Sequence, residues 1–589
     1  MKLVVMAMMI FAAAPVALGG EPAAAPALPA LQDYFKPGQL EPLPEGMASL
    51  YRVPWRSNVQ TALARDAFNG VGVYYKHVPP WTIEENTLVM KQMAQAGVKR
   101  MRIAPHLAMS VSPKWTGPSP DEAKGLKSEL TGCKKAGIRP CVIFVHLPPM
   151  GTQESFQKWV DQTHPWKKDW MPQGVVGSPE YDAINEKNWI AMEFMLKTAR
   201  EAGFTKAGSY DMEMGQNIWW GFPALQPNPA LTLKDLQPGG LVYESDKALV
   251  DRARKAGYVE PNLLCGQSYH YFDKMSDQEL PQAEAGRAIS FYSQFAGVTD
   301  DQSLNDPKKP FGSDAWPARP ALKYAEGKPP VVTLVKPEGF MADFSRRDCL
   351  ISMLKSGKFP VAITSLGVVP SDIPSAMVDK KEGEKTVKVK AEGVDGFLLK
   401  SKGLTRSLAF WLNQGASFVL IHSAYERGNA EMSHALIPDI ADVKAFKWQD
   451  SRPLTTMKAF VEPLRTGQKL DKLTDLKFKY ALADDAELIP ASEKGGPLKA
   501  SDAVALLSFQ ISKKKFAVAA YVVTPTITVP YKPTKMTLQV DKKVRGDVAT
   551  SNPVSGATGK ATIVEKTEAA TTMTFDVTDD VTWLVFQIN

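Results

Sequence analysis

One arrangement of apolar and polar positions recurs through the first 420 residues: an amphipathic helix, then a glycine, then a short apolar run. The apolar residues of each helix are three and four apart, as in Val89, Met93 and Ala96, which places them on one helical face. The junctions are Ala96-Gly97-Val98, Ala136-Gly137-Ile138, Ala202-Gly203-Phe204, Ala256-Gly257-Tyr258 and Gln414-Gly415-Ala416. A glycine just after a helix takes the left-handed conformation without a Cβ penalty, so the chain can turn directly into a strand.

The starts of three helices are also visible in the sequence. Thr82 with Glu85, and Ser119 with Glu122, have the spacing of capping boxes, in which each residue bonds the backbone N–H of the other. Proline at position 120 suits the first turn of a helix, and the pair Ser178-Pro179 predicts a third start of the same kind.

The apolar runs between these helices are continuous rather than alternating, as in residues 141–145. Continuous apolar runs are typical of strands covered on both faces, as in a parallel sheet. We expect strands at residues 70–75, 98–103, 138–145, 206–212, 261–266, 288–292, 359–364 and 416–421. Eight helix-linked parallel strands predict an α/β fold, a (β/α)₈ TIM barrel over residues 51–460. The alternative is a doubly wound open sheet, but no glycine-rich phosphate loop follows the first strand.

The helical period disappears after about residue 465. The segments that follow are β-rich and are separated by Gly, Asn, Asp and Pro; the clearest are residues 516–523, 536–540, 571–577 and 581–588. Short strands at this spacing predict an antiparallel β-sandwich over residues 465–589.

The N-terminal segment is read as a targeting signal rather than as part of the fold. Residues 1–20 hold one lysine, an apolar run and small residues near a cleavage site, which is the order found in a secretory signal peptide. A membrane anchor is the alternative, but Pro15 and the short apolar run argue against it. Residues 21–50 form an Ala/Pro-rich tether. We therefore expect a secreted or periplasmic protein.

Composition excludes several classes of function. The net charge of +7 is spread over 589 residues, so no nucleic-acid surface is indicated. The four cysteines lack the C-x-x-C spacing of a metal site, and we expect buried thiols rather than a disulfide framework. The histidines are dispersed, so we predict no metal and no cofactor. We expect a monomer or a weak oligomer.

In such a barrel the reactive side chains lie at the carboxyl ends of the strands. The candidates at or after the expected strand ends are Arg102, His106, His146, Asp211, Glu213, Gln216, Asn217, Tyr269, His270, Ser365 and His422. Tryptophans crowd the same loops, and Trp219 and Trp220 follow strand 206–212. Flat aromatic faces beside polar side chains suit sugar rings. The sequence thus predicts a carbohydrate-binding groove at this end of the barrel.

Three segments carry a resemblance to a known family. Residues 97–103 (GVKRMRI), 210–217 (YDMEMGQN) and 358–367 (KFPVAITSLG) resemble the second, fourth and seventh strand motifs of the clan A retaining (β/α)₈ glycoside hydrolases. The closing sandwich, with its NPVSG turn at 552–556, is similar to the β domain that often follows such barrels. The resemblance implies a polysaccharide or oligosaccharide ligand.

The chain departs from the family at the positions that matter most. Members carry an acid/base Glu after the fourth strand and a nucleophilic Glu after the seventh, and the matching positions here hold Asn217 and Ser365. Gln216 stands where the family has Asn. An amide has no ionisable proton to donate, and a serine without a base is a poor nucleophile.

Two interpretations follow from these departures. In the first, other carboxylates perform glycoside hydrolysis: Glu213 or Asp211, with Glu338, Asp372 or Glu426 from later loops. In the second, the barrel is a non-catalytic carbohydrate-binding protein that keeps the groove and lacks the reaction. A serine hydrolase built on Ser365 and His422 is a third class, but the sequence has no G-x-S-x-G elbow.

Overall fold

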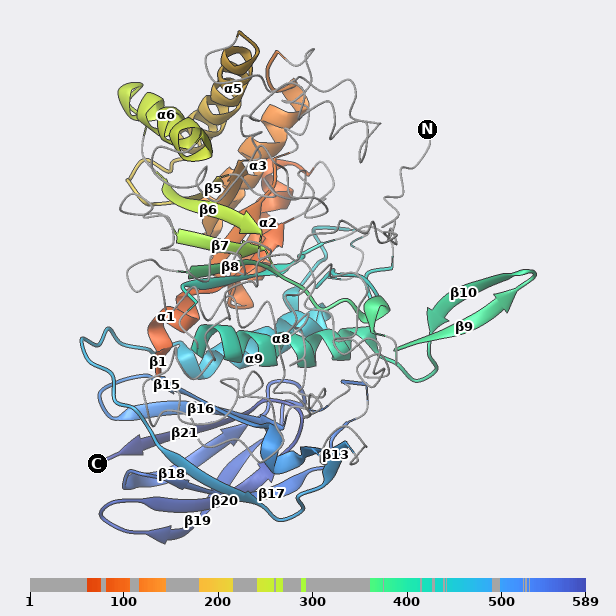
Figure 1. Cartoon of the computed structure of the whole chain (residues 1–589), viewed down its shortest axis with the longest axis vertical. Coiled ribbons are helices and arrows are strands. Elements are labelled where there is room, and N and C mark those ends of the chain that lie inside the picture. Colours follow the sequence, from red (N-terminus) through yellow and green to blue (C-terminus); the bar gives the residue numbers. More distant parts are fainter. Residues whose placement is uncertain are drawn as a thin grey trace, which may run out of the picture.

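The computed structural model describes residues 61–75, 81–105, 116–144, 179–214, 241–258, 261–268, 288–292, 361–373, 376–413, 416–425, 429–437, 440, 442–489, 498–522, 524, 527–528 and 530–589. Within these ranges, no helix has both the length and the apolar character needed to cross a membrane. An α/β region is followed by a separate antiparallel sheet, as the sequence predicts (Figure 1).

Eight parallel strands form the α/β region. They are β2 (Val71–Tyr75), β3 (Arg100–Ile103), β4 (Arg139–Phe144), β5 (Asp211–Met214), β6 (Asn262–Ser268), β7 (Ala288–Tyr292), β8 (Val361–Leu366) and β11 (Phe418–His422). Each strand pairs with the next in chain order, and β11 pairs with both β8 and β2. The strands therefore form a closed barrel, and their carboxyl ends meet at one end of it.

Seven helices accompany these strands in the described part of the chain. They are α1 (Ala64–Asn69), α2 (Ile83–Gln95), α3 (Pro120–Ala136), α5 (Pro179–Glu201), α6 (Leu241–Lys255), α8 (Gly396–Asn413) and α9 (Arg452–Val461). Helices α2, α3 and α5 begin where the sequence predicts. Both predicted capping boxes are present, at Thr82 with Glu85 and at Ser119 with Glu122. Helix α3 ends at Gly137, whose φ of 69° is the left-handed conformation expected there.

The fourth barrel strand begins later than the sequence predicts. The expectation was residues 206–212, but a turn closed by Ser209 N donating to Lys206 O occupies the first part, and β5 spans Asp211–Met214. Gly208, with a φ of 65°, permits this turn. Asp211 and Glu213 consequently both lie within β5, whereas the expected strand 206–212 contains Asp211 and ends before Glu213. Ser365 likewise lies within its strand rather than after it, because β8 continues to Leu366.

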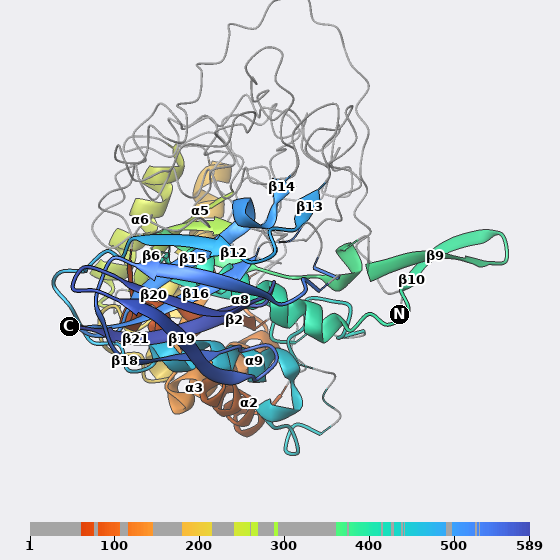
Figure 2. The same ribbon diagram turned by 90° about the horizontal axis from the view of Figure 1, so that it is seen from below.

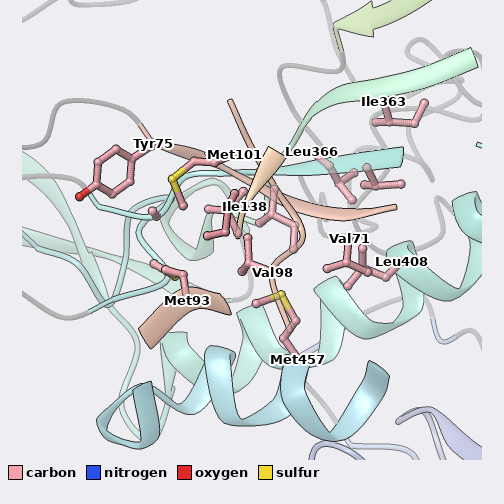
Figure 3. Packing of buried hydrophobic residues seen from close by; sticks show 14 of the residues in the cluster. Val71, Tyr75, Met93, Val98, Met101, Ile138, Ile363, Leu366, Leu408 and Met457 are labelled. Atoms are coloured by element: carbon pink, nitrogen blue, oxygen red, sulfur yellow. The ribbon is translucent and has the colours of Figure 1, made fainter. Parts of the chain in front are cut away.

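Alternate residues of the barrel strands face the helices and the barrel interior. Val71, Val73 and Tyr75 of β2 belong to the main buried cluster, where side chains from α8 and α9 meet them (Figure 3). Gly72 faces inward, and a Cβ there would lie 2.4 Å from Leu420 Cδ2 and 2.9 Å from the Arg100 carbonyl oxygen. Only glycine fits at this position of β2.

The C-terminal part is an antiparallel sheet. Its strands are β12 (Phe478–Leu482), β15 (Val504–Gln510), β16 (Lys515–Val522), β17 (Thr534–Val540), β18 (Val544–Ser551), β19 (Thr558–Lys566), β20 (Thr571–Val577) and β21 (Thr582–Ile588). Together with β1 (Ala62–Leu63) they hydrogen-bond in the single order β1-β15-β16-β21-β18-β19-β20-β17-β12. Strand β16 contacts β20 although three strands separate them, so the sheet curls over its own core.

The N-terminal side of the chain contributes one strand to this sheet. Strand β1 (Ala62–Leu63) pairs in parallel with β15, and Thr61 Oγ1 lies 2.8 Å from Ser508 Oγ. Residues 61–63 thus join the C-terminal sheet rather than the barrel, in which the sequence analysis placed everything from residue 51. The boundaries at 20, 50 and 460–465 stay predictions.

A layer of helices joins the barrel to the sheet. Helices α8 and α9 lie between them in Figure 1. Strand β15 is buried along its whole length, because Ala505, Leu507 and Phe509 share the cluster of α8 while Val504 and Leu506 face the core of the sheet itself. Strand β16 is buried on both faces in the same way.

Buried charged side chains of helix α8 form ion pairs with the C-terminal part of the chain. Asp579, between β20 and β21, accepts from Arg406 Nη2 at 2.8 Å, and Lys402 Nζ lies 2.5 Å from the same oxygen. The other oxygen of Asp579 accepts from the backbone N of Tyr531 at 3.0 Å. A buried carboxylate with these three partners fixes α8 against the sheet.

The remaining elements are short. They are η8 (Pro370–Asp372), β9 (Met377–Glu382), β10 (Lys385–Lys390), η10 (Trp448–Asp450), η11 (Glu462–Leu464), β13 (Glu487–Ile489), β14 (Leu498–Lys499) and η12 (Ala500–Ala503). The hairpin β9–β10, which the sequence analysis did not predict, projects away from the rest of the molecule in both views (Figures 1 and 2).

We predict that Asp579→Asn lowers the free energy of unfolding by about 3–5 kcal/mol, because it leaves Lys402 and Arg406 buried without their carboxylate. The measurement is urea unfolding, followed by tryptophan fluorescence. Asp547→Asn is the matched control: Asp547 and Lys560 form an exposed pair, and its loss is expected to leave the free energy of unfolding nearly unchanged. Equal effects of the two variants would contradict the assigned role of Asp579.

Candidate functional site

A buried ion pair lies inside the barrel toward the carboxyl ends of the strands. Arg102 Nε donates to Glu213 Oε2 at 2.7 Å, and the two side chains are 0% and 1% exposed. Arg102 is the third residue of β3 and Glu213 the third of β5, so the pair reaches across the intervening strand β4. Charges removed from water in this way are tolerated only when they are paired.

A second ionic group lies nearer the amino ends of the same strands. Asp211 accepts from Arg139 at 2.9 and 2.6 Å and from Arg100 at 2.6 Å. Asp211 is two residues before Glu213 on β5, so both carboxylates face the same side of the strand in successive layers. Arg100 and Arg102 repeat this spacing on β3.

Cys141 of β4 occupies the space between these layers. It pairs in register with Arg102 on one side and Asp211 on the other, and it is a free, buried thiol. Burial raises the pKa of the Cys141 thiol well above its usual value, with Glu213 and Asp211 adding to the effect. A small, neutral side chain on β4 leaves room for the arginine of β3 to reach the carboxylate of β5.

Aromatic rings complete the layer that holds the Arg102–Glu213 pair. The Arg102 guanidinium lies 4.6 Å from the centre of the Tyr74 ring, and Tyr74 stacks on His422 at 5.0 Å. The ring of His434 follows, 4.3 Å from that of His422. Tyr74, Arg102, Glu213 and His422 thus form one continuous row at the carboxyl ends of four strands. The row combines a flat aromatic surface with polar edges.

Next to this row, Trp81 lies 5.7 Å from Tyr425 and 6.3 Å from Tyr75, measured between ring centres. Gly367 allows His434 to approach the end of β8, because a Cβ at Gly367 would lie 2.9 Å from His434 Nδ1. Aromatic side chains from distant parts of the sequence therefore gather at this end of the barrel.

The structure brings together three of the predicted site residues, Arg102, Glu213 and His422, and separates Asp211 from them. Asp211 is the first residue of β5, so it lies toward the amino ends and not at the carboxyl ends as the sequence analysis had it. The backbone of Ser365 lies in β8. The backbone of Asp372 lies in η8. Ten further candidates fall outside the described residues: His106, His146, Gln216, Asn217, Trp219, Trp220, Tyr269, His270, Glu338 and Glu426.

The geometry limits the chemistry open to Glu213. A carboxylate paired with a guanidinium acts as a hydrogen-bond acceptor, whereas a general acid must donate a proton to the leaving oxygen. Glu213 therefore has the contacts of a residue that positions Arg102. As for metals, no cluster of three or more His, Cys, Asp or Glu suited to an ion occurs among the residues the structure describes.

Three residues of these groups, Arg100, Arg139 and His434, were not among the predicted site residues. The signal for the arginines was present: Arg100 and Arg102 share one face of a strand, as do Asp211 and Glu213, and the two sets match in charge and spacing. No comparable signal existed for His434, which reaches its neighbour from a loop without a regular pattern.

We predict that Glu213→Gln costs about 3–5 kcal/mol of unfolding free energy, because Arg102 then stays buried without a counter-charge. Glu201→Gln is the matched control, since its pair with Lys127 is about half exposed on both sides and contributes about 0–1 kcal/mol. Denaturant unfolding of the two variants tests the assignment. A Glu213 variant as stable as the Glu201 variant would overturn it.

Comparisons with known proteins give similarity in structure only. No family model and no curated protein matches the sequence. A family 39 glycoside hydrolase from Bacteroides cellulosilyticus WH2 is 12% identical over 88% of this chain and 82% of its own, with a TM-score of 0.45. A family 30 subfamily 8 xylanase from Clostridium acetobutylicum is 11% identical over 88% and 96%, with a TM-score of 0.42. A family 5 glycoside hydrolase from Bacteroides vulgatus ATCC 8482 is 10% identical over 88% and 89%, also at 0.42.

Proposed function

We propose that this chain is an exported carbohydrate-binding protein whose saccharide site lies at the carboxyl ends of the barrel strands. In this proposal Glu213 holds Arg102 in place and does not protonate a glycosidic oxygen. The observation that carries it is the buried pair of Arg102 and Glu213, joined at 2.7 Å and continued by the rings of Tyr74 and His422.

The row of side chains suits a sugar ligand. The C–H faces of a sugar ring pack against aromatic rings, while its hydroxyl groups need fixed donors and acceptors. Tyr74 and His422 are themselves buried, so in the proposal they form the bottom of the saccharide site. The residues that contact the sugar lie between these two rings and the solvent. The tryptophans predicted for the groove, Trp219 and Trp220, follow β5 in the sequence and are among these residues in the proposal.

The same observations favour binding over hydrolysis. Retaining hydrolysis needs two carboxyl groups about 5–5.5 Å apart, one to donate a proton and one to attack the sugar. Glu213 is engaged by Arg102, and the positions that the family resemblance assigns to the two carboxylates hold Asn217 and Ser365. In the proposal the barrel therefore keeps a binding surface and does not use a reacting pair of carboxylates.

Export is part of the proposal and rests on the sequence alone. Residues 1–20 have the order of a secretory signal peptide, and residues 21–50 form an Ala/Pro-rich tether between that signal and the folded part. A secreted or periplasmic location gives a carbohydrate-binding protein access to extracellular glycans.

The test is a titration of intrinsic tryptophan fluorescence with neutral oligosaccharides of glucose, xylose and mannose. We expect one of these to bind the wild type, and Trp219→Ala or Trp220→Ala to weaken that binding by about tenfold or more. Trp448→Ala is the control, because Trp448 lies beside Gln92 of helix α2 and outside the row described above. Equal losses in all three variants, or no response to any sugar, would count against the site.

Activity is measured on the same ligands as the release of reducing ends. The wild type is expected to release none, and Asn217→Glu with Ser365→Glu is expected to gain hydrolysis, since one general acid alone is worth about 10²–10⁴-fold in rate. Hydrolysis by the wild type that Glu213→Gln abolishes, while sugar binding persists, would instead make Glu213 the catalytic acid.

A further inference from the structure

A second concave site lies at the opposite end of the barrel, where the strands begin. A pocket with a volume of about 720 Å³ opens there, which is within the usual range for small-molecule sites. Its walls come from helix α1, from the starts of β3 and β4, and from the segment at Lys469 that leads from η11 toward the C-terminal sheet. No step of the proposed saccharide binding uses it.

The lining of this pocket is strongly basic. Five cationic side chains face one acidic one: Arg65, Lys99, Arg100, Arg139 and Lys469 against Asp66. Asp211 lies behind Arg100 and Arg139 and pairs with both. The five cationic side chains and the two carboxylates together carry a net charge of three positive units.

Most of this excess positive charge is not balanced by a carboxylate among the described residues. Arg65, Lys99 and Lys469 form no ion pair within the part of the chain that the structure describes. Burial lowers the pKa of Lys99, and the nearby cations Lys458 and Arg465 lower it further. The positive charge around Lys99 is therefore crowded as well as unpaired.

The floor of the pocket is held in a fixed geometry. Asp211 engages Nε and Nη2 of Arg139 and Nη1 of Arg100, and the two arginine side chains remain 29% and 17% exposed. Arg139 Nη1 and Arg100 Nη2 are not used in these bonds. Asp211 holds the two guanidinium groups in a fixed orientation, so their remaining N–H donors are preorganised. Carboxylates and phosphates bind guanidinium N–H donors in pairs.

We propose that this pocket binds a small anion that carries two or more carboxylate or phosphate groups. One anionic group meets the fixed guanidinium donors of Arg100 and Arg139, and another reaches Arg65, Lys99 or Lys469. Because Lys469 leads toward the sheet and the other cations belong to the barrel side, the bound anion links the two parts of the chain. The proposal is independent of carbohydrate binding at the other end.

The test uses the full chain and two probes, pyrophosphate and citrate, in isothermal titration calorimetry and thermal unfolding at low ionic strength. At least one probe is expected to bind and to raise Tm, with an affinity that falls as NaCl is added. Binding of pyrophosphate alone assigns a phosphate ligand, binding of citrate alone a carboxylate ligand, and binding of both a site that recognises charge and spacing.

Two charge-reversed variants locate the binding. Arg65→Glu with Lys469→Glu is expected to raise Kd at least ~10-fold, because both exposed side chains line the pocket. Lys381→Glu with Lys385→Glu, in the exposed hairpin β9–β10, changes the net charge by the same amount and is expected to leave Kd unchanged. No binding of either probe, or equal weakening in both double variants, would overturn the proposal.

Discussion

The barrel depends on the pairing of charges that its strands carry inside. Two carboxylates of β5 and two arginines of β3 face the interior, and Arg139 of β4 adds a third guanidinium. Each carboxylate is stable there only because an arginine lies against it, since an unpaired buried charge would cost several kcal/mol. A shift of β5 by one residue would turn Asp211 and Glu213 away from these arginines, so the ion pairs fix the register of three strands.

This constraint divides the barrel into two ends with different chemistry. Toward the carboxyl ends the described pair is fully buried and is continued by aromatic rings, which gives a polar and aromatic surface whose two charges neutralise each other. Toward the amino ends the arginines that hold Asp211 are partly exposed and stand among further cations. The first end suits a neutral ligand that is rich in hydroxyl groups, and the second suits an anion.

Much of the architecture could be predicted from local sequence patterns. The eight barrel strands, both capping boxes and the strands near 516–523, 536–540, 571–577 and 581–588 are confirmed, because each depends on a short-range rule of periodicity or capping. The start of β5 could not be predicted, since it depends on a turn at Lys206–Ser209 rather than on apolar content. Strand β15 was not among the predicted strands, although its apolar run is buried on both faces like that of β16.

The candidate site was harder to predict, because it depends on which strands become neighbours. Arg102, Glu213 and His422 were identified individually, but their relationship follows from the closed strand order and from small residues such as Gly72 and Cys141 that leave the interior open. The resemblance to glycoside hydrolases pointed to Asn217 and Ser365 as altered positions, and it could not indicate that Glu213 is held by an arginine.

The most direct measurement of the central claim is a crystal structure of the protein with a bound oligosaccharide. We expect sugar density over the carboxyl ends of β5 and β11, with Glu213 still within hydrogen-bond distance of Arg102. Sugar bound with Glu213 turned away from Arg102 and placed against a glycosidic oxygen would contradict the central claim, as would sugar bound only at the amino ends of the strands.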